Sequence, residues 1–169
     1  MTPVGAVARG LAAGALGTLA MDLLWYVRYR REDGKSRFAH WEFSGDVLSW
    51  DAAPAPAVVG KRLVEGLLQV ELPDHRAGLT NNVTHWGYGM LMGAQYGLLA
   101  GSLRGRHLWL GLPFGAAVWG SSYVVLPAAG LYKQIWEYDR GTLTKDLTAH
   151  LVFGLGTAVA FAAMAGRHR

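Results

Sequence analysis

Three long stretches without a charged side chain constrain the fold of this chain more than any other feature. No Asp, Glu, Lys or Arg occurs in the 27 residues between Arg76 and Arg104, the 26 between Arg106 and Lys133, or the 20 between Asp146 and Arg167. An α-helix needs about 20 mostly apolar residues to cross the hydrocarbon core of a bilayer. Each stretch is therefore long enough for one membrane-spanning helix.

A fourth apolar stretch runs from residue 10 to residue 27, and Asp22 is its only charged residue. Arg9 before it and the small residues within it would also fit a cleaved signal peptide. We adopt a retained helix, because the apolar stretch continues through "LLWYV" and three more stretches follow it.

The chain is thus predicted to be an all-α, polytopic membrane protein with a single membrane domain over residues 1–169. The predicted transmembrane helices cover about residues 4–27, 83–103, 107–132 and 146–166. Thr80, Asn81 and Asn82 are expected to cap the second of these helices, and Pro113 and Pro127 to kink the third.

Residues 28–80 form the predicted extramembrane segment. It contains apolar side chains typical of the headgroup level of a membrane, namely Phe38, Trp41, Phe43, Val47 and Trp50. Further along, a helical spacing of apolar residues predicts a short amphipathic helix, through Val59, Leu63, Leu67 and Val70. This helix is expected to lie on the membrane or against the bundle.

Composition removes several classes of function. The chain has no cysteine, which excludes a disulfide framework, a thiolate metal site and a cysteine nucleophile. Its net charge of +4 comes from Lys and Arg at the ends of the apolar stretches. That position is typical of residues that anchor helices at a membrane surface, so the expected partner is the lipid bilayer and not nucleic acid.

Glycine recurs at every fourth position of "HWGYGMLMGAQYGLLAG", as Gly89, Gly93, Gly97 and Gly101. Small residues at this spacing let membrane helices approach closely. We expect this face, a glycine zipper, to pack against small-residue faces on the first and last helices, which carry Gly10, Gly14 and Gly154. Several such faces in one small bundle favour a homo-oligomer.

Four ionisable residues are expected near one membrane face, since the chain directions place Asp22, His85, Asp146 and His150 at similar depth. Ionisable residues at membrane depth are costly and mark candidate functional sites. Three interpretations are open. The residues form a structural hydrogen-bonded network, a proton-responsive cluster, or a metal site with His85, His150 and Asp146 as candidate ligands.

No catalytic motif is recognisable. Ser121 and Ser122 lack a Gly-x-Ser-x-Gly turn and are expected to bond to backbone or to a neighbouring helix. No phosphate-binding loop occurs. The chain is therefore expected not to be an enzyme, with no catalytic residue and no cofactor apart from the possible metal.

The segments "GLAAGALGTLAMD", "THWGYGMLMGAQYG", "LWLGLPFGAAVWGSSYVVLPAAGL" and "KDLTAHLVFG" resemble the YagU-like family of small bacterial inner-membrane proteins. The resemblance implies four helices in the inner membrane, both termini in the cytoplasm and a link to survival in acid, with no established molecular activity. "RYRRED" departs from the proline-rich exit of the family's first helix, so nothing is carried over for the long loop.

The favoured hypothesis is a proton-sensitive small channel or transporter linked to acid tolerance. The main alternative is a non-transporting accessory or scaffold protein. A metal-dependent membrane hydrolase is the third interpretation. Charge alone leaves the orientation in the membrane open.

Overall fold

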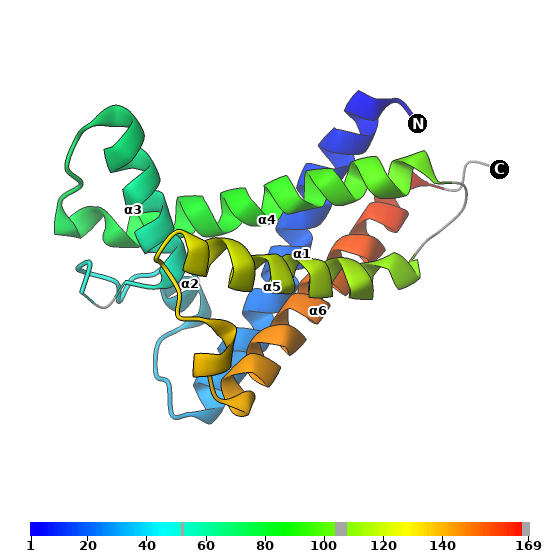
Figure 1. Ribbon diagram of the computed structural model, residues 1–169. Coiled ribbons are helices and arrows are strands. Elements are labelled where there is room, and N and C mark those ends of the chain that lie inside the picture. Colours follow the sequence, from blue (N-terminus) through cyan, green and yellow to red (C-terminus); the bar gives the residue numbers. More distant parts are fainter. Residues whose placement is uncertain (52, 104–107, 167–169) are drawn as a thin grey trace. The chain divides into compact units, whose positions relative to one another are not determined.

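The computed structural model describes residues 1–51, 53–103 and 108–166, and within these ranges it consists of helices and connections without a β-strand (Figure 1). The predicted all-α class is confirmed. The chain forms two compact units. We call residues 1–25 together with the described residues from 89 onward the bundle unit, and residues 26–88 the intervening unit.

The long helices are α1 (Pro3–Arg31), α4 (Ala77–Ser102), α5 (Gly111–Ala128) and α6 (Arg140–Ala165). Short elements are α2 (Phe38–Glu42), α3 (Ala55–Leu68) and the 3-10 turns η1 (Asp74–Arg76), η2 (Leu108–Leu110) and η3 (Ile135–Glu137). The bundle unit takes the first part of α1, the second part of α4, and α5 and α6.

Among the described residues, three helical segments are long and apolar enough to cross a membrane, namely Pro3–Arg31, Leu108–Ala128 and Arg140–Ala165. These segments indicate a membrane protein. α4 is as long as α6 but is not among these segments, and its first half carries Asn81, Asn82 and His85. A fourth transmembrane helix therefore stays a prediction.

Several predicted helix boundaries are wrong because they were placed where charges end an apolar stretch. α1 continues to Arg31, and α6 begins at Arg140 instead of residue 146. A charged residue ends an apolar stretch of sequence, but the helix can continue through it. The start of α6 is fixed by a cap, since the Asp139 side chain accepts a hydrogen bond from the Thr142 amide at 2.9 Å.

The predicted caps of α4 are also wrong. The helix begins at Ala77, so Thr80, Asn81 and Asn82 lie inside it. Asn82 Nδ2 donates to the Gly78 carbonyl at 3.0 Å, and Asn81 Nδ2 donates to Ser44 Oγ at 2.8 Å. The Asn82 bond therefore lies within α4, the Asn81 bond joins α4 to the segment at Ser44, and neither side chain caps the helix.

Helix α5 is shorter than predicted, since it ends at Ala128 and not near residue 132. Pro113 lies in its first turn, where a missing amide interrupts no helical hydrogen bond, and Pro127 is its penultimate residue. Neither proline occupies the helix middle. The predicted start at residue 107 and the "RGR" connection fall outside the described residues.

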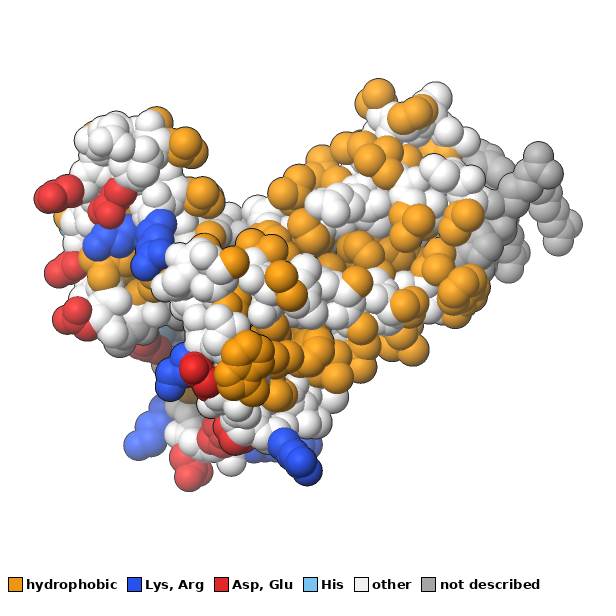
Figure 2. Space-filling view, in the orientation of Figure 1, with side chains coloured by type: hydrophobic (Ala, Val, Ile, Leu, Met, Phe, Trp, Pro, Cys, Tyr) orange, Lys and Arg blue, Asp and Glu red, His pale blue; other side chains and the backbone are white. Residues whose placement is uncertain are grey.

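Small residues fill the interior of the bundle unit. Ala13, Thr18 and Thr157 have no exposed surface, and the Tyr96 ring packs edge-on against Phe161 with centroids 5.8 Å apart. Large aliphatic side chains point outward instead, as Leu91, Val124 and Val159 do. Figure 2 shows such hydrophobic side chains along the viewed faces of α4 and α5. Small residues inside and leucine or valine outside suit a bundle surrounded by lipid.

Aromatic rings organise the intervening unit. The Tyr26 ring lies 5.1 Å from Phe38 and 5.4 Å from Trp41, measured between centroids. Trp50 Nε1 donates to the Leu72 carbonyl at 3.0 Å. Three residues predicted to form a headgroup-level belt therefore pack within this unit. Phe43 remains 64% exposed.

Candidate functional site

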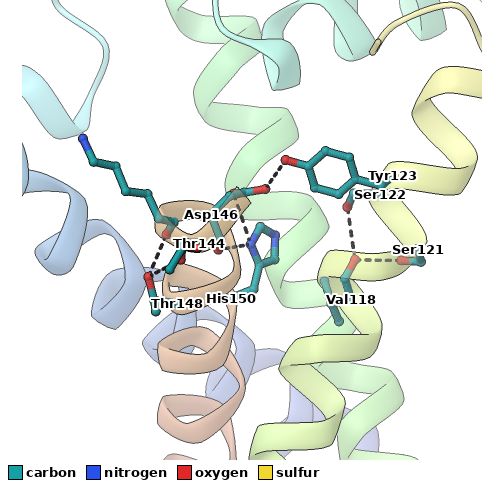
Figure 3. A network of polar contacts seen from close by, with 9 residues as sticks. Val118, Ser121, Ser122, Tyr123, Thr144, Asp146, Thr148 and His150 are labelled. Atoms are coloured by element: carbon teal, nitrogen blue, oxygen red, sulfur yellow. Dashed lines mark hydrogen bonds and ion pairs between the residues drawn. The ribbon is translucent and has the colours of Figure 1, made fainter. Parts of the chain in front are cut away.

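The candidate site joins α5 to α6 through three polar side chains of the bundle unit (Figure 3). Asp146 and His150 are four residues apart on α6, a spacing that places both on one helix face. His150 Nδ1 lies 3.3 Å from Asp146 Oδ1, and the Tyr123 hydroxyl on α5 donates to Asp146 Oδ2 at 2.9 Å. One carboxylate thus links a histidine on its own helix to a tyrosine on the neighbouring helix.

The surroundings of His150 define which ring nitrogen takes up a proton. Its Nδ1 lies 2.9 Å from the backbone carbonyl oxygen of Asp146. A carbonyl oxygen only accepts, so Nδ1 carries the hydrogen in this bond. The neutral ring therefore has its lone pair at Nε2. Protonation there gives an imidazolium next to the Asp146 carboxylate.

Aromatic side chains enclose the pair. The side chains of His150 and Asp146 are only 17% and 24% exposed. The Tyr123 ring lies 5.8 Å from Tyr132 and 5.4 Å from Tyr138, both in the connection between α5 and α6. Burial, followed by the negative charge of Asp146, raises the pKa of Tyr132 to about 12. Tyr132 consequently keeps its hydroxyl proton at physiological pH and presents a neutral wall.

Glycines bring the backbones of α5 and α6 close enough for this contact. A Cβ added at Gly115 would lie 3.2 Å from Leu151 Cα and would collide with the His150 carbonyl oxygen. A Cβ added at Gly154 would lie 2.7 Å from the Gly115 amide nitrogen. The polar site therefore depends on two positions without a side chain.

The other predicted packing glycines lie where α1 approaches α4 within the bundle unit. An added Cβ would lie 2.9 Å from a facing Cα atom at three positions, namely Gly10 against Ala94, Gly14 against Gly93 and Gly97 against Gly10. A Cβ at Gly89 would collide with the Thr18 hydroxyl, and one at Gly101 would lie 3.0 Å from Ala6 Cβ. A side chain at Gly10, Gly14 or Gly97 would meet the backbone of the facing helix and force the two helices apart.

The structure brings together two of the four predicted ionisable residues, Asp146 and His150. Asp22 is buried on α1 in the bundle unit, with 5% of its surface exposed. His85 is half-buried on the part of α4 that belongs to the intervening unit. A meeting of Asp22 and His85 with the α6 pair remains a prediction.

Within the described part of the chain, no group of three or more His, Asp or Glu side chains is arranged to hold a metal ion. Asp146 and His150 together supply two side chains that could be metal ligands. Both serines of α5 have backbone partners, as predicted, because Ser121 and Ser122 donate to the Val118 carbonyl at 2.8 and 3.1 Å.

Tyr123 was not among the candidate site residues predicted from the sequence, although it completes this site. A tyrosine in an apolar helix carries a hydroxyl that needs a polar partner when buried. That requirement was the available signal. The partner itself lies on another helix, 23 residues further along the chain, and no local pattern identifies it.

Comparison of the chain with models of protein families, with curated proteins and with solved structures gives no match. The resemblance to the YagU-like family therefore remains a prediction.

Proposed function

We propose that this chain is a multi-pass protein of the bacterial inner membrane, a small proton-sensitive channel or transporter in which Tyr123, Asp146 and His150 form the proton-responsive element. One observation carries the proposal: an enclosed Asp–His pair on an apolar helix is bonded to a second apolar helix through Tyr123. Ionisable residues at such positions commonly mark ion or proton pathways.

α4 is proposed as the fourth helix in the membrane. Its 26 residues correspond to about 39 Å at 1.5 Å per residue, more than the hydrocarbon core requires. Its glycine face lies against α1, and Leu91, Leu98 and Leu99 on its other faces are exposed. Lipid is a suitable neighbour for those side chains.

Protonation of the pair supplies the switch. Histidine is the side chain that normally changes charge between pH 5 and 8. A proton on His150 Nε2 makes the ring a cation and draws the Asp146 carboxylate toward it. The carboxylate then accepts less strongly from Tyr123, and the contact between α5 and α6 loosens. Tyr123 from α5 and Tyr132 and Tyr138 from the connection are titratable groups beside the pair among the described residues.

The proposed orientation of the chain in the membrane places the Asp146–His150 pair where external acid can protonate it. We place both termini in the cytoplasm, as the family resemblance implies, which puts the beginning of α6 on the outer side. Asp146 and His150, near that end, would then respond to protons from outside. The exposed apolar faces of the bundle are also available for association with further copies of the chain.

Flux through proteoliposomes tests the proposal. Vesicles containing a pH-sensitive dye and the purified protein are exposed to an external step from pH 7 to pH 5. We expect proton flux that increases at the lower pH for the wild type. His150→Gln, which keeps a polar side chain but takes up no proton in this range, should remove that increase.

His40 provides the matched control. It also pairs with an aspartate, but on the surface of the intervening unit, so His40→Gln should leave the flux unchanged. Wild-type flux equal to that of protein-free vesicles at both pH values would refute transport. Equal responses of the wild type and His150→Gln would refute the role of the α6 pair.

A further inference from the structure

A groove opens in the intervening unit between α3 and the beginning of α4. Its volume is 530 Å³, within the range of about 300 to 1,000 Å³ typical of small-molecule sites. Val64 of α3, Leu72 and Pro73 of the connection, and Leu79 and Val83 of α4 give it mainly apolar walls. It is separate from the α5–α6 site, because all of its lining belongs to residues 26–88.

The walls of the groove continue into exposed apolar surface. Leu79 and Val83 are 54% and 66% exposed, and Leu63 and Leu67 on α3 are 55% and 79% exposed. Large apolar side chains grouped in this way usually mark a binding or membrane surface. Lys61 and Glu65, also on α3, form an ion pair with Nζ and Oε1 3.9 Å apart.

The lining of the groove includes one cationic side chain, Arg76. His75 and Arg76 are the only ionisable side chains among the described residues that line it. Glu65 is nearby but already bound, because its Oε1 accepts from the Leu72 amide at 2.9 Å and lies near Lys61. Glu71 and Asp74, on the same connection, are exposed and do not contribute to the lining. A guanidinium next to an apolar slot complements a ligand with an anionic head and a hydrocarbon chain.

Gly60 maintains the shape of this groove. A Cβ added there would lie 2.6 Å from Thr80 Cγ2 and would collide with the Thr84 hydroxyl. α3 therefore lies close to α4 at Gly60, which is itself part of the lining of the groove.

We propose that this groove binds one anionic diacyl phospholipid, with an acyl chain between α3 and α4 and its phosphate on Arg76. Lipid is the favoured occupant, since three helical segments among the described residues of the same chain are long and apolar enough to cross a membrane. The proposal does not depend on the proton response of the α6 pair.

Photo-crosslinking of purified full-length protein in detergent tests the site. The probe is phosphatidylglycerol with a diazirine in one acyl chain, and the crosslinked peptides are located by mass spectrometry. We expect saturation at one lipid per chain and labelling of peptides from α3 and the beginning of α4. The matching diacylglycerol probe, which lacks the phosphate, should bind about tenfold more weakly. Inorganic phosphate at millimolar concentration should not compete.

Two exposed positions test the contacts without disturbing the core. Arg76→Gln should lower the affinity for phosphatidylglycerol about tenfold, and Val83→Asn should lower labelling by both probes. The controls are Arg37→Gln and Leu48→Asn, exposed residues of the same unit outside the groove. Circular dichroism verifies that each variant is folded.

The proposal is overturned if the labelling of α3 and α4 is absent, if it occurs equally with the control substitutions, or if both probes bind with equal affinity. Crosslinks between two copies of the chain at α3, in place of lipid labelling, would overturn it in favour of self-association.

Discussion

The two units each contain an aspartate–histidine pair, and the pairs differ in surroundings more than in chemistry. In the intervening unit, His40 Nε2 lies 2.9 Å from Asp46 Oδ1, with the side chains 54% and 64% exposed. In the bundle unit, His150 and Asp146 are 3.3 Å apart and only 17% and 24% exposed. The contact between His40 and Asp46 is shorter but contributes less to stability, because water screens an exposed pair and keeps its interaction energy near zero.

The enclosed pair is also connected differently. Asp146 accepts from Tyr123 on a neighbouring long helix, whereas Asp46 accepts from Ser36, only ten residues away along the chain. A change in charge on Asp146 or His150 therefore acts on the packing of two helices. A change on Asp46 or His40 acts on a surface loop.

The largest expected effect comes from separating α5 and α6. Gly115→Val would push a side chain into the backbone of α6 at His150, and overpacking of this kind should lower the free energy of unfolding by about 3 kcal/mol. Gly120→Val on the same helix is the control, because an added Cβ there has no neighbour within 4 Å. Unfolding in detergent micelles gives both values. Equal losses would show that the α5–α6 approach does not support the enclosed pair.

A smaller effect follows from neutralising each aspartate. Asp146→Asn keeps the side-chain shape but weakens the bonds to Tyr123 and His150, which should cost about 1.5 kcal/mol. Asp46→Asn should leave the unfolding midpoint unchanged, since both side chains of that pair are more than half exposed and water screens them. The same micelle assay compares the variants at pH 7. A larger loss for Asp46→Asn would reverse the ranking of the two pairs.

The smallest effect is the acid response of the exposed pair. Hydrogen bonds from Ser36 and then from His40 lower the pKa of Asp46 below its usual value. The folded state therefore holds the proton less tightly than the unfolded state. The contribution of the Asp46 carboxylate to the free energy of unfolding is complete above the unfolded pKa of about 3.9. It is lost as the pH falls through the lower pKa of the folded state.

Carboxyl NMR titration should show Asp46 protonating at a lower pH than an unfolded aspartate. Ser36→Ala should move that titration back upward, because it removes the largest cause of the shift. A wild-type titration at or above the unfolded value would contradict the hydrogen bonding of this loop.

Sequence patterns anticipated the helices better than their ends. Apolar length predicted α1, α5 and α6, because crossing a bilayer sets a minimum run of apolar residues. It misplaced the start of α6, since the cap at Asp139 is a polar signal unrelated to apolar length. "DRGT" contains that signal, an aspartate three positions before Thr142.

The site was predicted in part. Asp146 and His150 share a helix face through local geometry, so their spacing was sufficient to pair them. Tyr123 could not be assigned in the same way, because its partner depends on how α5 packs against α6. The relation of Asp22 and His85 to the pair rests on similar packing of distant segments, and it stays a prediction.

The sequence by itself determined that the chain is helical and largely apolar, because charge-free length and glycine periodicity are properties of single segments. Tertiary structure alone decided which polar groups meet. Gly115 and Gly154 allow two backbones to approach, and that approach places the Tyr123 hydroxyl on the Asp146 carboxylate. The physical reason is that a hydrogen bond requires atoms within about 3 Å, a condition that only the packing of helices distant in sequence can meet.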